Sequence, residues 1–346
     1  MVCALGTLLV TGACRPGASR DEVLRGLVDQ VVTQDLLDVE RRSRDLSWAA
    51  RRLATAPAEP ELVALRAAWR RAALSWKRAS ALRAGPLVTT QALSRASYWP
   101  ARTAAIRELL AREDPASASQ VAGLGADVKG LYALEYLLFD QEGEPAAWQR
   151  LASAPGARSA RELVCAYAEE VCAYGESARK SLGSGARGFS AEFSRAGQQS
   201  INSVVCLLAE SVENLLAARL TLVLWLASLQ RLRAADVEGG PSRVSHELSL
   251  ALLLGSQRLY LGGSGGGLAD LVERAAPAIH RRLVATFASA VAALRGLAAP
   301  IEAVVLSDRR RVEAALRALK ALEAALKNDL PSSLGVTLAF TALDAD

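Results

Sequence analysis

One carboxylate lies in an otherwise apolar segment of the sequence. Glu135 is part of the run GLYALEYLLF, which spans residues 130–139. At helical spacing Glu135 shares one face with Tyr132 and Tyr136, while leucines form a second face, so the segment predicts a helix that is buried on two sides. A charge in that setting must be hydrogen-bonded, paired with a cation, bound to a metal or neutralised by a proton. Glu135 is therefore the first candidate for a functional site.

The other residues that could do chemistry lack the partners that chemistry needs. The chain has two histidines, and a metal site needs three or four converging ligands. His246 and Glu247 start like the zinc-binding sequence HExxH, but residue 250 is leucine. His280 has no partner in its own segment and is interpreted as a helical histidine. The glycine run 262–267 lacks the Gly-Lys-Ser/Thr ending of a phosphate-binding loop and is interpreted as a connection between helices.

The composition predicts an all-α protein. Of the 346 residues 51% are apolar but only 5% are aromatic, so the interior is built mainly from Ala, Leu and Val. Such an interior favours close-packed helices. Ser19 and Glu22 form a capping box at the start of a long first helix. We expect two packed helical bundles of the four-helix type, in residues 19–152 and 153–346, after an N-terminal segment 1–18.

Charge and hydropathy exclude two classes of partner. The net charge of +5 is spread along the helices, and no basic stripe with interleaved aromatic residues predicts a nucleic-acid site. The arginines at 309–311 are interpreted as a solvated helix face. The most apolar internal stretch, residues 215–229, contains Arg219, so we interpret it as a buried bundle helix rather than a membrane span.

The N-terminus predicts export. Residues 1–13 are apolar and uncharged, and the sequence from Thr11 to Cys14 resembles the lipobox of a bacterial lipoprotein, although a cationic start is missing. We expect a lipid anchor on Cys14, an association with the cell membrane, and a location in the periplasm or at the outer membrane. Cleaved soluble export and an ordinary N-terminal core segment are the alternatives.

The cysteines of the body leave two interpretations open. Cys165 and Cys172 are seven residues apart on one predicted helix, so they cannot bridge each other. A disulfide from either one to Cys206 is compatible with an oxidising compartment. Small buried hydrophobic residues are the alternative interpretation of all three.

The segment around Glu135 resembles a family motif. Gly130 and Glu135 stand where the imelysin family of bacterial envelope proteins has the glycine and glutamate of its GxHxxE motif, and Tyr132 stands where that family has histidine. Further segments resemble the family's other signatures, in the same order: Trp76 with Gly85-Pro86, Arg95 with Tyr98-Trp99-Pro100, Pro241-Ser242-x-x-Ser245 with Tyr260-x-Gly262, and the closing Leu334-Gly335-Val336 to Asp344-Ala345-Asp346. The resemblance spans nearly the whole chain.

This resemblance implies two helical bundles with the motif residues near the cleft between them. The implied cleft residues are Arg95, Trp99, Gly130, Tyr132, Glu135, Ser242, Ser245 and Tyr260. In the family the motif histidine and glutamate are thought to bind metal, and the founding member is described as a metallopeptidase. The resemblance further implies involvement with iron acquisition or with peptides.

Because residue 132 is a tyrosine, the site has two possible interpretations. A neutral phenol is a poor ligand for Zn²⁺, whereas tyrosinate is a good ligand for ferric iron, so an iron or other metal ion held by Tyr132 and Glu135 is one alternative. In the other, Tyr132 donates its hydroxyl to Glu135 and Arg95 supplies the balancing charge. Ser242 and Ser245 would need a positioned base to act as nucleophiles, so we expect them to be helix caps or cleft contacts.

The sequence therefore predicts an imelysin-like binding protein of the cell envelope that has no general peptidase activity. There are two alternatives. One is an imelysin-type metallopeptidase, and the other is a divergent family member that serves an envelope protein or an iron-uptake partner.

Overall fold

A computed structural model of the chain describes residues 19–83, 88, 90–112, 118–264 and 266–337. Every regular element among these residues is a helix, apart from one isolated bridge between Gly263 and Gly266, so the all-α prediction is confirmed. The predicted lipidation site Cys14, the Gly85-Pro86 pair and the closing residues 344–346 lie outside the described residues.

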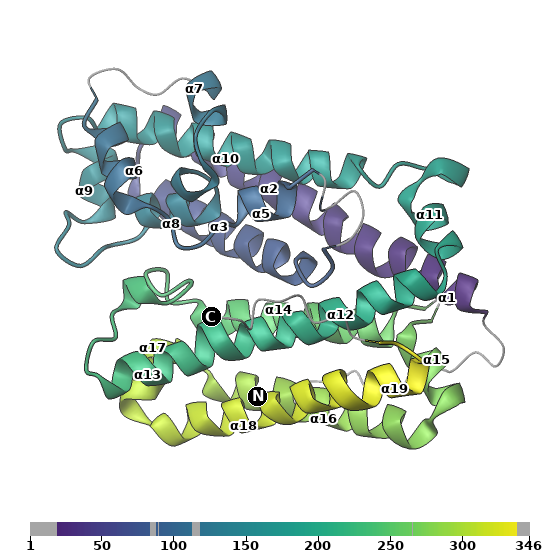
Figure 1. Cartoon of the computed structure of the whole chain (residues 1–346). Helices are drawn as coiled ribbons and strands as arrows, with labels where there is room; N and C mark the ends of the chain where they lie inside the picture. The colour runs from purple at the N-terminus through teal and green to yellow at the C-terminus, as the bar shows by residue number, and fades with distance from the viewer. Residues whose placement is uncertain (1–18, 84–87, 89, 113–117, 265, 338–346) are drawn as a thin grey trace, which may run out of the picture.

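The first bundle is built on three long helices and the short helix that carries Glu135. They are α2 (Thr33–Thr55), α3 (Glu59–Ala79), α8 (Leu131–Leu138) and α10 (Ala157–Lys180). Helix α1 (Arg20–Gly26) and the π-helical turn η1 (Leu27–Val32) run straight into α2, and the predicted capping box at Ser19 and Glu22 starts this long helix. Figure 1 shows α2, α3 and α10 side by side.

The predicted boundary at residue 152 assigns one helix to the wrong bundle. Helix α10 begins at Ala157, after this boundary, but it packs along α2 and so belongs to the first bundle. Its apolar face, with Leu163, Tyr167 and Val171, is buried there. A loop rich in small residues turns the chain, but it does not determine which bundle the next helix joins.

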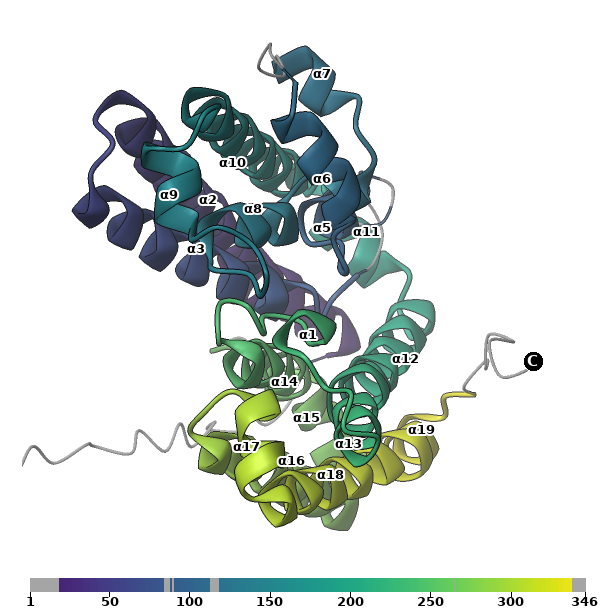
Figure 2. The same ribbon diagram turned by 90° about the vertical axis from the view of Figure 1, so that its left-hand side faces the viewer.

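The second bundle contains the helices that follow α11 (Phe189–Arg195). Its long members are α12 (Gln198–Leu215) continued by the π-helical η4 (Leu216–Thr221) and α13 (Leu222–Ser228), then α14 (Ser245–Leu261), α16 (Pro277–Leu297) and α18 (Arg309–Ala324) continued by η6 (Ala325–Asp329) and α19 (Leu330–Leu334). The view in Figure 2 shows this bundle as a separate layer beneath the first.

Short helices connect the long ones. They are α5 (Ala92–Ala96), α6 (Thr103–Leu110), α7 (Ala118–Ala122), η2 (Ala126–Val128), α9 (Ala147–Ala152), η3 (Gly185–Arg187), η5 (Ala234–Asp236), α15 (Leu268–Ala275) and α17 (Ile301–Ser307).

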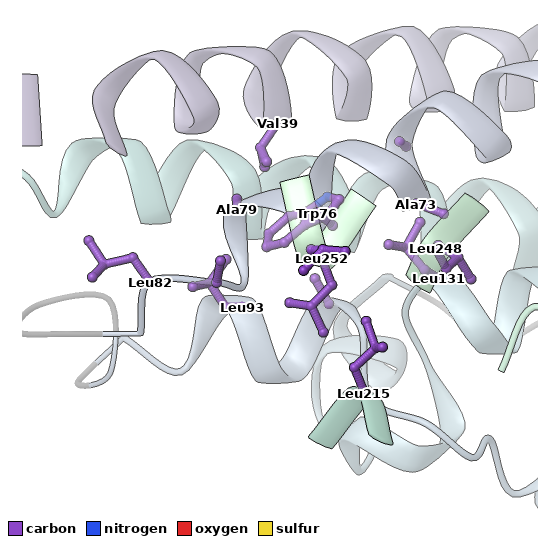
Figure 3. Packing of buried hydrophobic residues seen from close by; sticks show 14 of the residues in the cluster. Val39, Ala73, Trp76, Ala79, Leu82, Leu93, Leu131, Leu215, Leu248 and Leu252 are labelled. Carbon is purple, nitrogen blue, oxygen red and sulfur yellow. The ribbon is translucent and has the colours of Figure 1, made fainter. Parts of the chain in front are cut away.

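The two bundles meet where α14 packs on α3. A Cβ atom at Gly255 would lie 2.3 Å from the carbonyl oxygen of Arg78, so only glycine allows the two helices to come this close. Trp76 is fully buried beside this contact, and its indole Nε1 donates to Ser43 Oγ at 2.9 Å. In Figure 3, Trp76 lies close to Leu252 of α14, so the apolar core is continuous across the two bundles.

Among the described residues one single helix passes a simple test for a membrane span. Residues Gln198–Ser228 are long and apolar enough to cross a membrane by length and composition, and 50% of the most apolar window is buried inside the molecule. A core helix passes the same test. This helix packs against α14 and α18, as predicted for a bundle helix.

Candidate functional site

Helix α8 is held in place by its first residues. Gly130 has φ +86°, and a Cβ atom there would lie 2.7 Å from the carbonyl oxygen of Ala96 and 3.0 Å from that of Arg95. Glycine is therefore required on both counts. The carbonyl of Leu131 accepts a 2.7 Å hydrogen bond from Trp69 Nε1 of α3. All residues of α8 are buried, as the sequence predicts.

Tyr132 reaches across to the second bundle. Its hydroxyl donates to the carboxylate of Glu238, which lies in the loop before α14. The same carboxylate forms ion pairs with Lys77 of α3 and Arg219 of η4, and all four side chains are buried. We call Lys77, Tyr132, Arg219 and Glu238 the charged joint. It links two helices of the first bundle to a helix and a loop of the second.

The charged joint keeps its carboxylate ionised. Burial alone would raise the pKa of Glu238, but the charges of Arg219 and Lys77 outweigh burial and lower this pKa to about 2. Burial lowers the pKa of Lys77 to about 8, although Glu238 opposes that shift. The phenol of Tyr132 has a pKa well above its usual value, because it is buried and lies beside the negative Glu238. Tyr132 therefore stays a neutral donor.

Glu135 lies one helical turn further along α8 and also contacts the second bundle. Its Oε1 accepts hydrogen bonds from the backbone N–H of Ser242, at 3.1 Å, and from the Ser242 hydroxyl. Burial raises the pKa of Glu135 to about 8; the Ser242 hydrogen bonds oppose this, and the nearby Glu238 and Glu302 add to it. Within the described residues no cation lies within ion-pair distance of Glu135. Its carboxyl group is mostly protonated at neutral pH.

The prediction that Arg95 pairs with Glu135 is wrong. Arg95 is exposed, and its Nε donates to Gln91 Oε1 at 3.2 Å. Arg95 contacts the motif through its backbone carbonyl, which lies against Gly130, and its side chain therefore points away from Glu135. The predicted donation from Tyr132 to Glu135 is wrong as well, because the hydroxyl bonds to Glu238.

Two of the remaining predicted cleft residues are bonded to groups other than Glu135. Ser245 donates to Glu302 Oε2 at 2.6 Å and accepts from the backbone N–H of Ile301 at 2.9 Å, so it connects α14 to α17 and does not cap its helix. Tyr260 is fifteen residues further along α14, about 22 Å from Ser245. Its hydroxyl lies 3.1 Å from His280 Nδ1 in the core of the second bundle. Placing Tyr260 in the cleft was wrong.

Sequence reasoning missed the charged partners in the joint, although one of them carried a signal. Arg219 lies in an apolar helix, as Glu135 does, and a lone charge in such a segment predicts a partner. Lys77 had no such signal, because its helix α3 carries several arginines, among them the adjacent Arg78. Arg219 was noted only as an argument against a membrane span. Glu238 had no such signal, because it lies in a polar loop.

Trp99 lines an open groove of about 760 Å³ beside the charged joint. Trp99 and Pro100 form the wall from the first bundle. The wall from the second is formed by Leu222 and Leu226 of α13 and by residues 230–233, 235 and 236. The chain continues from this second wall to Glu238, so the groove and the charged joint share one loop.

A sequence model of the imelysin family, peptidase family M75, matches residues 33–328. The chain belongs to the imelysin family. Two solved structures share its fold. One is a protein from Parabacteroides distasonis that carries the provisional name iron-regulated protein A precursor. It is 17% identical to this chain, and the match covers 92% of this chain and 97% of that chain at a TM-score of 0.77. An imelysin-like protein from Psychrobacter arcticum is 19% identical, with 93% and 97% covered at a TM-score of 0.74. No curated protein matches the chain.

The residues at the imelysin motif do not fit a bound metal. The Tyr132 hydroxyl acts as a donor to Glu238, and Lys77 and Arg219 place two positive charges against that carboxylate. A metal cation there would be repelled by both. Across the described ranges no three His, Cys, Asp or Glu side chains converge as a metal site would require.

Cys165 and Cys172 are partly buried thiols, and neither is joined to Cys206 by a disulfide. Burial raises the pKa of Cys165 to about 11, so this thiol is not a nucleophile at neutral pH.

Proposed function

We propose that this imelysin-family chain is a non-catalytic binding protein of the cell envelope. One observation carries the proposal: the polar groups at the motif are already bonded to other parts of the protein. Glu238 takes part in two ion pairs and accepts from Tyr132, and Glu135 accepts from Ser242. A catalytic acid, base or metal site needs groups that can contact a substrate. Here those groups connect the two bundles.

The peptidase alternative makes a different prediction for the same residues. A metallopeptidase would lose its activity in Glu135→Gln, and a serine-dependent hydrolase would lose it in Ser242→Ala. We expect the protein purified without chelators to contain far less than one metal ion per chain by mass spectrometry. We also expect no cleavage of an unfolded protein substrate, with or without added Zn²⁺. Cleavage that either substitution abolishes would overturn the non-catalytic proposal.

We also propose that the protein is exported and anchored through lipid on Cys14. The apolar run before this cysteine and the small residues at 12 and 13 support the proposal. Cys14→Ser should move the protein from the membrane to the soluble fraction, whereas Cys3→Ser, the control, should leave it bound. One acyl chain binds a membrane weakly, so the native form should carry more than one. Membrane retention of Cys14→Ser would contradict the anchor.

A link to iron acquisition is the second candidate function. It is favoured by the name of one structural relative, which calls that protein iron-regulated. If the link extends to this chain, its transcript should rise when the bacterium is grown with an iron chelator. A deletion strain should then take up radioactive iron more slowly. Unchanged transcript and uptake would exclude this candidate.

A further inference from the structure

The groove beside the charged joint has the size of a small-molecule site. Its volume of about 760 Å³ lies within the range of about 300 to 1,000 Å³ that is typical of ligand pockets. Its two walls come from different bundles, at the kind of boundary where ligand sites are commonly found.

The groove is lined mainly by apolar side chains. Trp99 and Pro100 face Leu222, Leu226 and Leu232 across it. The apolar surface extends beyond the groove, because Trp225 and Leu229 on the same helix are 57% and 44% exposed. The four side chains of α13 follow the i, i+3, i+4, i+7 spacing of one helix face. A ligand with an apolar body would remove this surface from water.

The net charge of the groove lining is positive. Asp236 lines it, but this carboxylate accepts from Arg233 at 2.7 and 3.1 Å and from the Arg233 backbone N–H. Arg231 also lines the groove, and no acidic side chain of the described ranges pairs with it. The uncompensated charge is therefore a single guanidinium. Guanidinium groups bind carboxylate and phosphate in a bidentate geometry.

The wall that carries Arg231 is preformed. At the end of α13, Gln230 has φ +55° and its N–H donates to Ala227 O, while Arg231 N–H donates to Leu226 O at 3.0 Å. These two bonds form a Schellman motif, which fixes the backbone at the C-terminal end of a helix. Further along, a Cβ at Gly240 would lie 1.9 Å from the carbonyl oxygen of Ala234, so the loop is tightly folded. A rigid wall lowers the entropy cost of binding.

We propose that this groove binds an anionic amphiphile, a molecule with an apolar chain and one carboxylate or phosphate group. The chain lies between Trp99 and the leucines of α13, and the anionic group pairs with Arg231. The inference rests on the proposed binding function and names the chemistry of its ligand. The same chemistry occurs in free fatty acids and in anionic lipids of a membrane, so the test separates these two sources.

The test uses the full chain and three probes with twelve-carbon chains, each below its micelle concentration or solubility limit. Isothermal titration should show dodecanoate binding about tenfold more tightly than dodecanol, and dodecyltrimethylammonium binding more weakly still. Equal affinity for the three head groups would overturn the proposal. Binding to phosphatidylglycerol vesicles without binding of monomeric dodecanoate would also overturn it, because the source would then be a membrane surface rather than a groove ligand.

Substitutions place the binding at the groove. Arg231→Glu should weaken dodecanoate binding by roughly tenfold at low salt. Arg281→Glu is the matched control, since Arg281 is an exposed arginine of α16 that does not line the groove. It should change binding by about twofold or less. Leu226→Asn should weaken all three probes, since it acts on the apolar chain. Equal effects of the two arginine substitutions would contradict the assignment.

These outcomes are separate from those that test the non-catalytic function. If no dodecyl probe binds, while the protein contains no metal and cleaves no substrate, the amphiphile inference fails and the non-catalytic proposal stands. If the probes bind as expected but a substrate is cleaved, the non-catalytic proposal fails and the amphiphile inference stands.

Discussion

Glu238 and Glu135 are 4% and 3% exposed, and both carboxyl groups bond across the boundary between the two bundles. Their charge states differ: the carboxyl group of Glu238 is ionised, and that of Glu135 is mostly protonated at neutral pH. Glu238 contacts two cations and has a pKa of about 2, whereas Glu135 contacts a serine and has a pKa of about 8. The burial penalty acts on both groups in the same direction, so the partners cause the difference.

The comparison shows why α8 can serve as a structural helix. A buried charge with a complete set of partners costs little, and a carboxyl group without a cation avoids the cost by keeping its proton. Tyr132, which donates to Glu238, and Glu135 lie one turn apart on α8. Both bond to the loop at residues 238–242, which attaches the second bundle to this helix.

The largest expected effect comes from removing the charge of Glu238. Glu238→Gln leaves Lys77 and Arg219 buried without a counter-charge, which should lower the free energy of unfolding by about 3 to 5 kcal/mol at pH 7. Urea denaturation measures this change. Glu247→Gln is the matched control, since Glu247 pairs with Arg70 between the same two bundles but at the surface. Loss of an exposed pair should cost about 1 kcal/mol or less. Equal losses would show that burial of the joint is unimportant.

The second-largest expected effect is a dependence of the unfolding free energy on pH that is caused by the titration of Glu135. Its pKa is raised in the folded protein, from 4.5 to about 8, so its contribution to stability is complete below pH 4.5 and is lost as the pH rises towards 8. Between pH 5 and 8 the wild type should lose about 2 to 4 kcal/mol relative to Glu135→Gln, which does not titrate. Lys77 acts in the opposite direction, but only above pH 8, because its folded pKa is lowered from 10.5 to about 8.

Urea denaturation of both proteins at several pH values measures this difference. The two stability curves should converge or cross as the pH rises. Parallel curves from pH 5 to 8 would mean that Glu135 is ionised in the folded protein and that a cation compensates it.

The fold could be predicted from the sequence to a large extent, because apolar periodicity reports directly on helices. The segment around Glu135 and the helix containing Arg219 are buried as expected. The assignment of α10 to a bundle could not be predicted in this way. The apolar face of a helix shows that it packs, but it does not show against which neighbour.

The site was predicted only in part, for a similar reason. Glu135 and Gly130 stand out within one segment, and the serine at 242 came from the family resemblance. The partner of Tyr132 is 106 residues away in sequence, on a loop with no distinctive pattern. Spacing along the chain predicts partners on the same helix, whereas these contacts depend on how two bundles pack.

A smaller effect should follow from removing the hydroxyl of Tyr132. Tyr132→Phe deletes one donor to Glu238 but keeps both cations, so the expected loss is about 1.5 to 3 kcal/mol, as for hydrogen bonds to charged groups. Tyr167→Phe is the control, because the buried Tyr167 hydroxyl has no hydrogen-bond partner among the described residues. That change should be neutral or slightly stabilising. A similar loss in both variants would show that the bond to Glu238 contributes nothing.

The smallest effect is expected for the substitution that introduces a histidine at position 132. Tyr132→His adds an imidazole, which is a good metal ligand, next to a carboxylate that Lys77 and Arg219 already neutralise. A divalent cation would have to displace both side chains, so titration with Zn²⁺ should show no binding beyond that of the wild type. Removing one positive charge as well, in Tyr132→His with Lys77→Met, should allow weak binding. Tight zinc binding by the single variant would show that the cations do not exclude metal, and Glu238 would then be a potential ligand rather than only part of the joint.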